Sequence, residues 1–149
     1  MFFVFVLGGE DPIDHVQRKA LRSGRQLHPL LERTMRIHVT EEARHLSFAR
    51  AYLRTTVPQL RRTRRKALAL AASGILATMA QVMMQSPRHL VERYGTADDV
   101  IARTYGRGTD AHRDTVESLR KVRDLLVELE LVPAHARRLW RRLGIWDES

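Results

Sequence analysis

Three side chains of types that commonly bind metal ions share one face of a predicted helix. His38, Glu42 and His45 follow one another at spacings of four and three residues in the segment 36–50, RIHVTEEARHLSFAR. Because an α-helix makes one turn in about 3.6 residues, these side chains fall within about 60° of arc. The chain has no cysteine, which excludes disulfides, thiolate metal sites and cysteine nucleophiles. Imidazole and carboxylate ligands suit iron, manganese or zinc.

The same helix face is otherwise apolar. The alternating spacing of four and three residues continues at apolar positions on either side, a pattern typical of a helix that faces a bundle. These positions are Leu31, Met35, Ala49 and Leu53. A carboxylate buried on such a face would cost on the order of several kcal/mol if it had no partner. A metal ion would compensate the charge of Glu42, and so would a buried arginine.

A second carboxylate, that of Glu10, is predicted to lie at the same level on the preceding helix. Residues 23–26 supply turn residues, and Pro29 suits the first position of the next helix. Glu10 lies thirteen residues before Ser23, and Glu42 lies thirteen residues after Pro29. Both helices rise about 1.5 Å per residue, so an antiparallel hairpin brings the two carboxylates together. The pattern predicts a metal site formed by Glu10, His38, Glu42 and His45.

Some polar residues near this pattern leave alternatives open. A solvent-exposed helix face with His–Glu pairs four residues apart would give the same spacing without a metal. Asp14 and Gln17 follow Glu10 on its face, either as hydrogen-bond partners that orient ligand histidines or as ordinary surface residues. The other histidines show no ligand spacing and are expected at the surface. They are His15, His28, His89, His112 and His135.

Nearly every segment is predicted to be helical, because helix-favouring residues dominate and strand-like alternation is absent. We expect an all-α fold in one domain, 1–149, with a metal-ligand hairpin over 1–57 and supporting helices over 58–149. Pro12 is expected to kink the first helix or to mark an irregular turn. The predicted helices cover residues 2–22, 29–57, 58–84, 88–94, 98–104, 110–130 and 133–143.

Two apolar segments raise the question of a membrane. Residues 67–84 carry no charge, but they are rich in alanine and contain polar residues, which favours a buried core helix over a membrane span. Residues 1–7, MFFVFVL, are too short for a span and lack the flanks of a secretory signal. Such an apolar start resembles the inside of a buried helix, so we expect the carboxy-terminal part of a larger protein. A cytoplasmic location is expected.

The chain is strongly basic. A formal net charge of +9 permits a polyanionic partner, and residues 61–66 include five cationic side chains. The 26 Lys and Arg residues are spread along the whole chain, however, and the run has no interleaved aromatic residues. A basic nucleic-acid-binding module, or a structural module without metal, is therefore the alternative function rather than the preferred one.

The segments GGEDPIDHVQR (8–18) and HVTEEARHLSFAR (38–50) resemble the para-aminobenzoate N-oxygenase family, the AurF-like non-haem diiron oxygenases. The resemblance is strongest over residues 2–57 and implies a ferritin-like helical bundle. It makes Glu10 a ligand from the third helix of the bundle, with Asp11 as the alternative if the register shifts by one. It makes His38, Glu42 and His45 the ligands from the fourth helix, His38 being the additional histidine of this family.

The resemblance also implies a second half of the site. The family places another Glu and a further Glu-x-x-His on two earlier helices, whereas Glu-x-x-His occurs here only at Glu42. We therefore expect an incomplete ferritin-like bundle: the natural protein is longer, a second polypeptide completes it, or the product is inactive. The complete site would hold two irons, with manganese as an alternative, and oxidise an amine with O2 and an external electron donor. A homodimer is considered, although the sequence does not show one.

Overall fold

A computed structural model describes residues 1–84, 88–95 and 98–146. Within these ranges the chain is helical and forms no strand, as expected for an all-α fold. The helices are α1 (Phe2–Arg22), α2 (Pro29–Thr56), η1 (Val57–Gln59), α3 (Arg62–Met84), α4 (Arg88–Tyr94), α5 (Asp98–Tyr105), α6 (Asp110–Ser118), α7 (Arg120–Glu128) and α8 (Ala134–Leu143).

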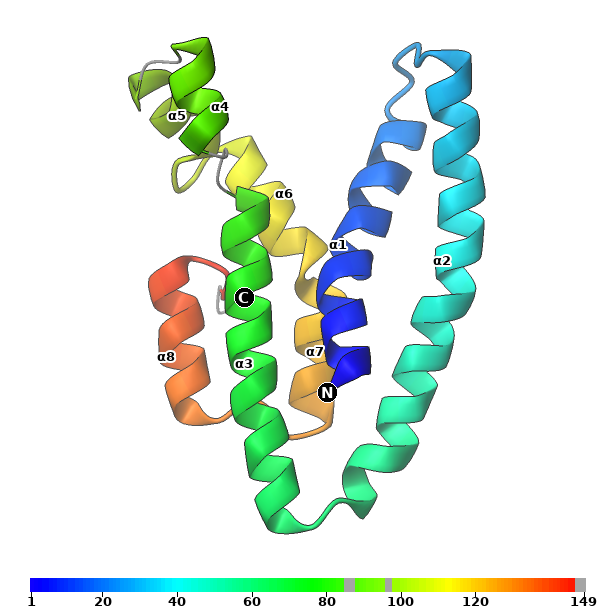
Figure 1. The fold of residues 1–149 in the computed structure, drawn as a ribbon, viewed down its shortest axis with the longest axis vertical. Coiled ribbons are helices and arrows are strands. Elements are labelled where there is room, and N and C mark those ends of the chain that lie inside the picture. Colours follow the sequence, from blue (N-terminus) through cyan, green and yellow to red (C-terminus); the bar gives the residue numbers. More distant parts are fainter. Residues whose placement is uncertain (85–87, 96–97, 147–149) are drawn as a thin grey trace.

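Helices α1 and α2 run antiparallel, and α1 lies between α2 on one side and α3, α6 and α7 on the other (Figure 1). The helices predicted over 2–22 and 29–57 are both present. Helix α1 continues through Pro12. Helix α2 begins at Pro29, whose missing N–H costs nothing there, and the Nδ1 of His28 accepts a hydrogen bond of 3.3 Å from the N–H of Leu30.

The core lies where α1 meets the carboxy-terminal helices. Val4 and Leu7 of α1 are buried together with residues of α3, α7 and α8. The indole Nε1 of Trp140 donates a hydrogen bond of 3.1 Å to the carbonyl oxygen of Ser73, which attaches α8 to α3. The alanines of α3 are therefore part of a packed core, as predicted. No helix in the described ranges is long and apolar enough to cross a membrane.

The basic run before α3 is partly used inside the fold. Arg65 donates hydrogen bonds to the carbonyl oxygen of Leu129, at 2.9 Å, and to the carboxylate of Glu130, at 2.8 Å. Arg54 likewise forms a two-bonded pair with Glu128 at the end of α7. These arginines hold the amino-terminal helices against α7, which reduces the cationic surface available to a polyanion.

Two predictions about the carboxy-terminal half were wrong. The expected continuous helix over 110–130 is divided at Leu119, whose backbone departs from ideal helix geometry (φ −83°, ψ −9°), and the hydroxyl of Ser118 donates a hydrogen bond to the carbonyl oxygen of Thr115 just before it. His112 is buried instead of lying at the surface, and its Nδ1 accepts a hydrogen bond of 3.3 Å from the N–H of Gly108.

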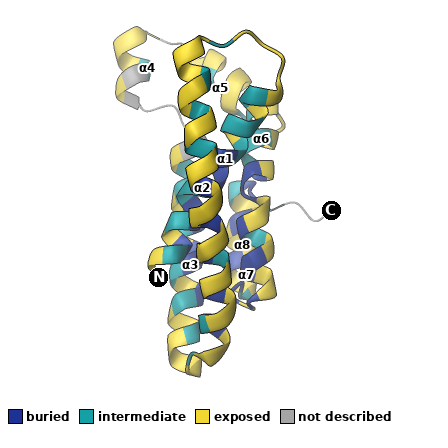
Figure 2. Cartoon of the chain, turned by 90° about the vertical axis from the view of Figure 1, so that its right-hand side faces the viewer, coloured by how far each residue is buried: buried dark blue, intermediate teal, exposed yellow. Residues whose placement is uncertain are grey.

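The burial predicted along α2 is correct for only part of the helix. Glu42, Ala49 and Leu53 are buried, but Leu31 is 46% exposed and the side chain of His45 is 61% exposed. Figure 2 shows α2 from its outer side, exposed along much of its length. The reason is that α2 packs mainly on α1, so the beginning of the helix has a neighbour on one side only. The apolar start of the chain is similarly divided, with Val4 buried and Phe2 71% exposed.

Candidate metal centre

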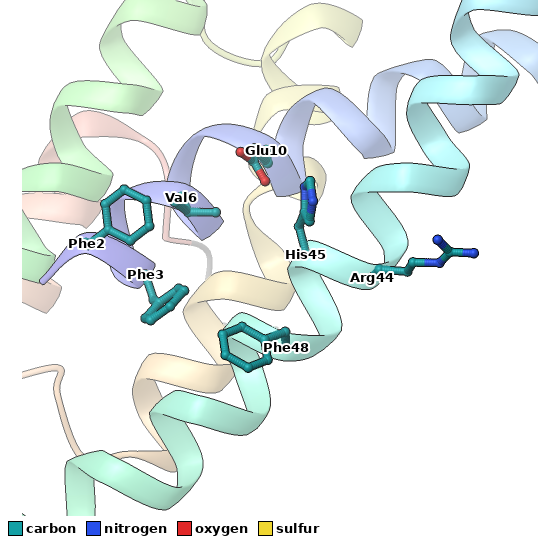
Figure 3. A pocket seen from close by; sticks show the side chains of 7 residues that line it. All are labelled: Phe2, Phe3, Val6, Glu10, Arg44, His45 and Phe48. Atoms are coloured by element: carbon teal, nitrogen blue, oxygen red, sulfur yellow. The ribbon is translucent and has the colours of Figure 1, made fainter.

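Glu10, Glu42 and His45 form a cluster where α1 and α2 face each other. One ligand-type atom from each of the three side chains lies within 4.8 Å of the other two. Glu10 comes from α1, whereas Glu42 and His45 are three residues apart on α2 and so lie on the same side of the helix. Figure 3 shows His45 rising from α2 toward Glu10. The equal distance of the two glutamates from the turn therefore brings them to one level, as the hairpin geometry predicts.

Two imidazoles flank the carboxylate of Glu42. The Nε2 of His38 lies 3.4 Å from Oε1 of Glu42, and the Nδ1 of His45 lies 3.5 Å from Oε2. His38 is thus beside the cluster, although it does not belong to the group of three whose atoms all lie within 4.8 Å. The structure brings all four predicted residues into one region of the hairpin.

Gln17 fixes the orientation of His38. The amide Oε1 of Gln17 lies 2.8 Å from Nδ1 of His38. Because an amide oxygen only accepts, a proton on Nδ1 would be donated to Gln17, which would leave Nε2, on the side of Glu42, as the ring nitrogen available to a metal. Asp14 has a different partner, since it pairs with Arg18 at 2.7 Å. Of the two polar residues that follow Glu10 on its face, only Gln17 contacts one of the predicted ligands.

The negative charge of the two glutamates is only partly offset within the cluster. Burial, a hydrogen bond with Glu42 and the charge of Glu42 raise the pKa of Glu10 to about 7, and the charge of His45 offsets part of this rise. Oε2 of Glu10 and Oε2 of Glu42 are buried, and neither accepts a hydrogen bond within the described part of the chain. Two carboxylates in this arrangement need a shared proton or a cation. The residues present therefore fit a metal ion.

Asp11, the alternative to Glu10, has another partner. Its carboxylate is buried and accepts a hydrogen bond from the guanidinium of Arg50 on α2. Burial raises the pKa of Asp11, and the positive charge of Arg50 opposes that rise. Arg50 thus compensates the buried charge of Asp11 between the two helices. Neither residue belongs to the group of potential ligands.

An aromatic cavity of about 490 Å³ opens beside the cluster. Its lining residues are Phe2, Phe3, Val6 and Phe48, with Glu10 and His45 at one end, and Arg44, whose side-chain end points away from the others (Figure 3). The rings of Phe3 and Phe48 meet edge to face at 5.5 Å between centroids. This cavity was not predicted from the sequence. The one signal for it in the sequence is the position of Phe48, three residues after His45. This spacing places the aromatic ring on the next helix turn, beside the histidine.

The Gln17 contact gives the first testable prediction. Replacing Gln17 by Leu removes the acceptor that holds His38, so ferrous-iron affinity should fall by about 10-fold, the lower range for loss of such a supporting partner. Anaerobic titration of iron into both proteins measures the change. Gln26→Leu, in the exposed turn, is the matched control and should leave the affinity unaltered. Equal losses of iron affinity in both variants would contradict the role of Gln17 in orienting His38.

The fold and cluster together define an all-helical protein with a candidate carboxylate–histidine metal site. Residues 1–130 match the family of p-aminobenzoate N-oxygenase AurF. The chain belongs to this family, which has a helical, ferritin-like fold and is a family of diiron enzymes.

Relatives from mycobacteria extend the match but carry no functional assignment. The chain is 36% identical over 140 residues to an uncharacterized protein of Mycobacterium tuberculosis strain CDC 1551, and 35% identical to uncharacterized proteins of strain H37Rv and of Mycobacterium bovis. Each match covers 94% of this chain and 41% of the relative. The chain thus spans about two fifths of the length of these relatives. No solved structure shows a significant match.

Proposed function

We propose that this chain holds iron at Glu10, His38, Glu42 and His45 and takes part in an O2-dependent oxidation. The observation that carries the proposal is the pair of buried carboxylate oxygens, on Glu10 and Glu42, that accept no hydrogen bond within the described part of the chain and lie in one cluster with the imidazole of His45. Such hard and intermediate ligands suit iron, and manganese is the alternative.

The bound metal would supply the electrons that reduce O2. The protein contributes binding and orientation. Glu10 and Glu42 provide the negative charge that attracts the cation, and Gln17 holds the ring of His38 so that Nε2 is available. The phenylalanine rings give the cavity beside the cluster an apolar wall, as is usual in binding sites for small molecules.

The proposed substrate is an amine, oxidised at nitrogen with electrons from an external donor. Family membership supports this reaction class, and the cavity supports an aromatic or similarly apolar substrate. Phe3 and Phe48 can receive a flat ring by edge-to-face contact, and the cavity ends at Glu10 and His45. A ring that enters this cavity would therefore bring its amine close to the metal.

The test is ferrous loading without oxygen, followed by exposure to O2 with and without an arylamine. The proposal predicts a visible absorption band and O2 consumption above that of free iron, both absent from a Glu42→Gln variant. Iron bound tightly with no O2 consumption would leave a metal site without the oxygenase activity. No iron bound at all would overturn the whole proposal.

A further inference from the structure

A buried ion pair joins α1 to α2 close to the metal cluster. It links the carboxylate of Asp11, whose side chain is fully buried, to the guanidinium of Arg50, whose side chain is 22% exposed. Asp11 directly follows Glu10 in α1, and Arg50 lies on α2 five residues after His45 and eight after Glu42. Each partner is therefore connected, through one continuous helix, to ligand-type residues of the cluster.

The pair is poorly suited to a purely stabilising role. Oδ2 of Asp11 is buried and accepts no hydrogen bond within the described part of the chain. A buried carboxylate with an unused oxygen loses hydration that its partner only partly replaces. Apolar residues that replace a buried ion pair often leave a protein equally stable or more stable. The pair therefore points to a different contribution, a fixed position of one helix relative to the other.

The other buried residues at this level are apolar, among them Leu7 on α1 and Leu46 and Ala49 on α2. Apolar attraction is non-directional, so it holds two helices together without fixing their register. A polar contact inside such a surface can fix the register. A slip by one residue would move Glu10 by about 1.5 Å along the helix axis and turn it by about 100°. A functional side chain must be held within about 0.5 Å.

Other polar contacts between the two helices lie nearer to the turn at residues 23–28. Gln17 contacts His38. The guanidinium of the next residue, Arg18, donates a hydrogen bond of 3.4 Å to the carbonyl oxygen of Val39. On α2, the glutamate and histidine of the cluster lie between these contacts and the ion pair. The hairpin is thus held on both sides of the site.

We propose that Asp11 and Arg50 set the register of α1 on α2 and thereby hold Glu10 opposite its partners in the cluster. The inference rests on the proposed metal-binding function. Neither residue of the pair belongs to the group of potential ligands. Asp11 and Arg50 are positioning residues, which act on the metal only through the placement of Glu10.

The test exchanges the pair for apolar residues in the full chain. Asp11→Leu combined with Arg50→Met removes both charges together, so neither is left without its partner. The urea midpoint of this double variant should equal or exceed that of the unaltered protein. Its ferrous-iron affinity, measured by anaerobic titration, should fall by at least about 10-fold. A loss of affinity without a loss of stability separates positioning from a structural role.

The register itself can be measured without metal. Because the chain has no cysteine, cysteines introduced at the exposed positions Phe5 of α1 and Ala51 of α2 can carry two spin labels. Pulsed electron paramagnetic resonance should give a narrow distance distribution when the ion pair is present. In the double variant the distribution should broaden or shift. This measurement does not depend on iron, so it also decides the register if the proposed metal binding fails.

Two comparisons control for charge and for helix packing. Arg54→Met combined with Glu128→Leu removes the ion pair between α2 and α7. This control should keep the label distances, and its iron affinity should stay within about twofold. Arg50→Lys keeps the positive charge and should lose less iron affinity than Arg50→Gln, which removes it. The two single variants test the proposal even where the double variant does not fold.

Two results would overturn the proposal. Unchanged iron affinity and unchanged label distances in the double variant would show that the pair does not set the register. A joint fall of stability and affinity, with unchanged label distances, would leave the pair a structural role only. Failure of the unaltered protein to bind iron would instead overturn the proposed function, and the label distances would still report whether the pair sets the register.

Discussion

Replacing Glu42 by Gln should lower ferrous-iron affinity by more than about 100-fold. Loss of an outer partner alone costs about 10- to 100-fold in comparable sites, and Glu42 is expected to bind the metal directly. It is also the residue that lies against both His38 and His45 and shares a cluster with Glu10. The amide is nearly the same size as the carboxylate but carries no charge, so the change removes the anion while keeping the packing. Anaerobic calorimetric titration measures the effect.

The adjacent residue provides the control. Glu41 is exposed on the neighbouring face of α2, so Glu41→Gln removes the same charge one position away. Its iron affinity should match that of the unaltered protein to within about twofold, because an exposed charge contributes little. Similar losses at positions 41 and 42 would mean that general negative charge, and not a ligand at Glu42, attracts the iron.

The second large effect is expected from Glu10→Gln, which should raise the stability of the metal-free protein. The pKa of Glu10 is raised from 4.5 to about 7, chiefly by burial and by Glu42. A carboxyl group with a raised pKa in the folded state ionises more easily after unfolding. The metal-free protein therefore loses stability as pH rises from about 4.5 through about 7, and the loss is complete above that range. Glu10→Gln abolishes this loss and should stabilise the metal-free protein at pH 8 by about 1–2 kcal/mol, allowing for partial exposure of the site.

Urea unfolding of the unaltered protein and of Glu10→Gln, at pH 8 and at pH 4.5, tests the direction of this stability change. The variant should be more stable at pH 8, whereas the difference should nearly vanish at pH 4.5. Added ferrous iron should then reverse the order at pH 8, because only the unaltered protein gains binding energy from the metal. A variant that is less stable than the unaltered protein at pH 8 without metal would show that Glu10 has a compensating partner.

The hairpin could be predicted from the sequence because its signals are local. Pro29 and the turn residues around Ser23 fix the ends of two helices, and helical periodicity fixes which residues share a face. From these features the position of Glu10 opposite Glu42 follows by counting residues. The bounds of α1 were predicted to the residue, and those of α2 to within one residue.

Burial could not be predicted with the same success, because it depends on what packs against a face. The spacing of Leu31 and Leu53 indicates an apolar surface, but it does not say whether that surface is covered. Leu31 is exposed in the structure, whereas Leu53 is buried. The break at Leu119 was also missed, because the apolar pattern continues regularly from α6 into α7.

The central claim is that paired carboxylates and imidazoles on α1 and α2 hold iron. The most direct measurement is the iron content of the unaltered protein after anaerobic ferrous loading and desalting at neutral pH, beside that of the Glu42→Gln protein. We predict about one iron per chain in the first protein, held by the four ligands of one hairpin, and nearly none in the second. Equal iron content in both proteins, or none in either, would contradict it.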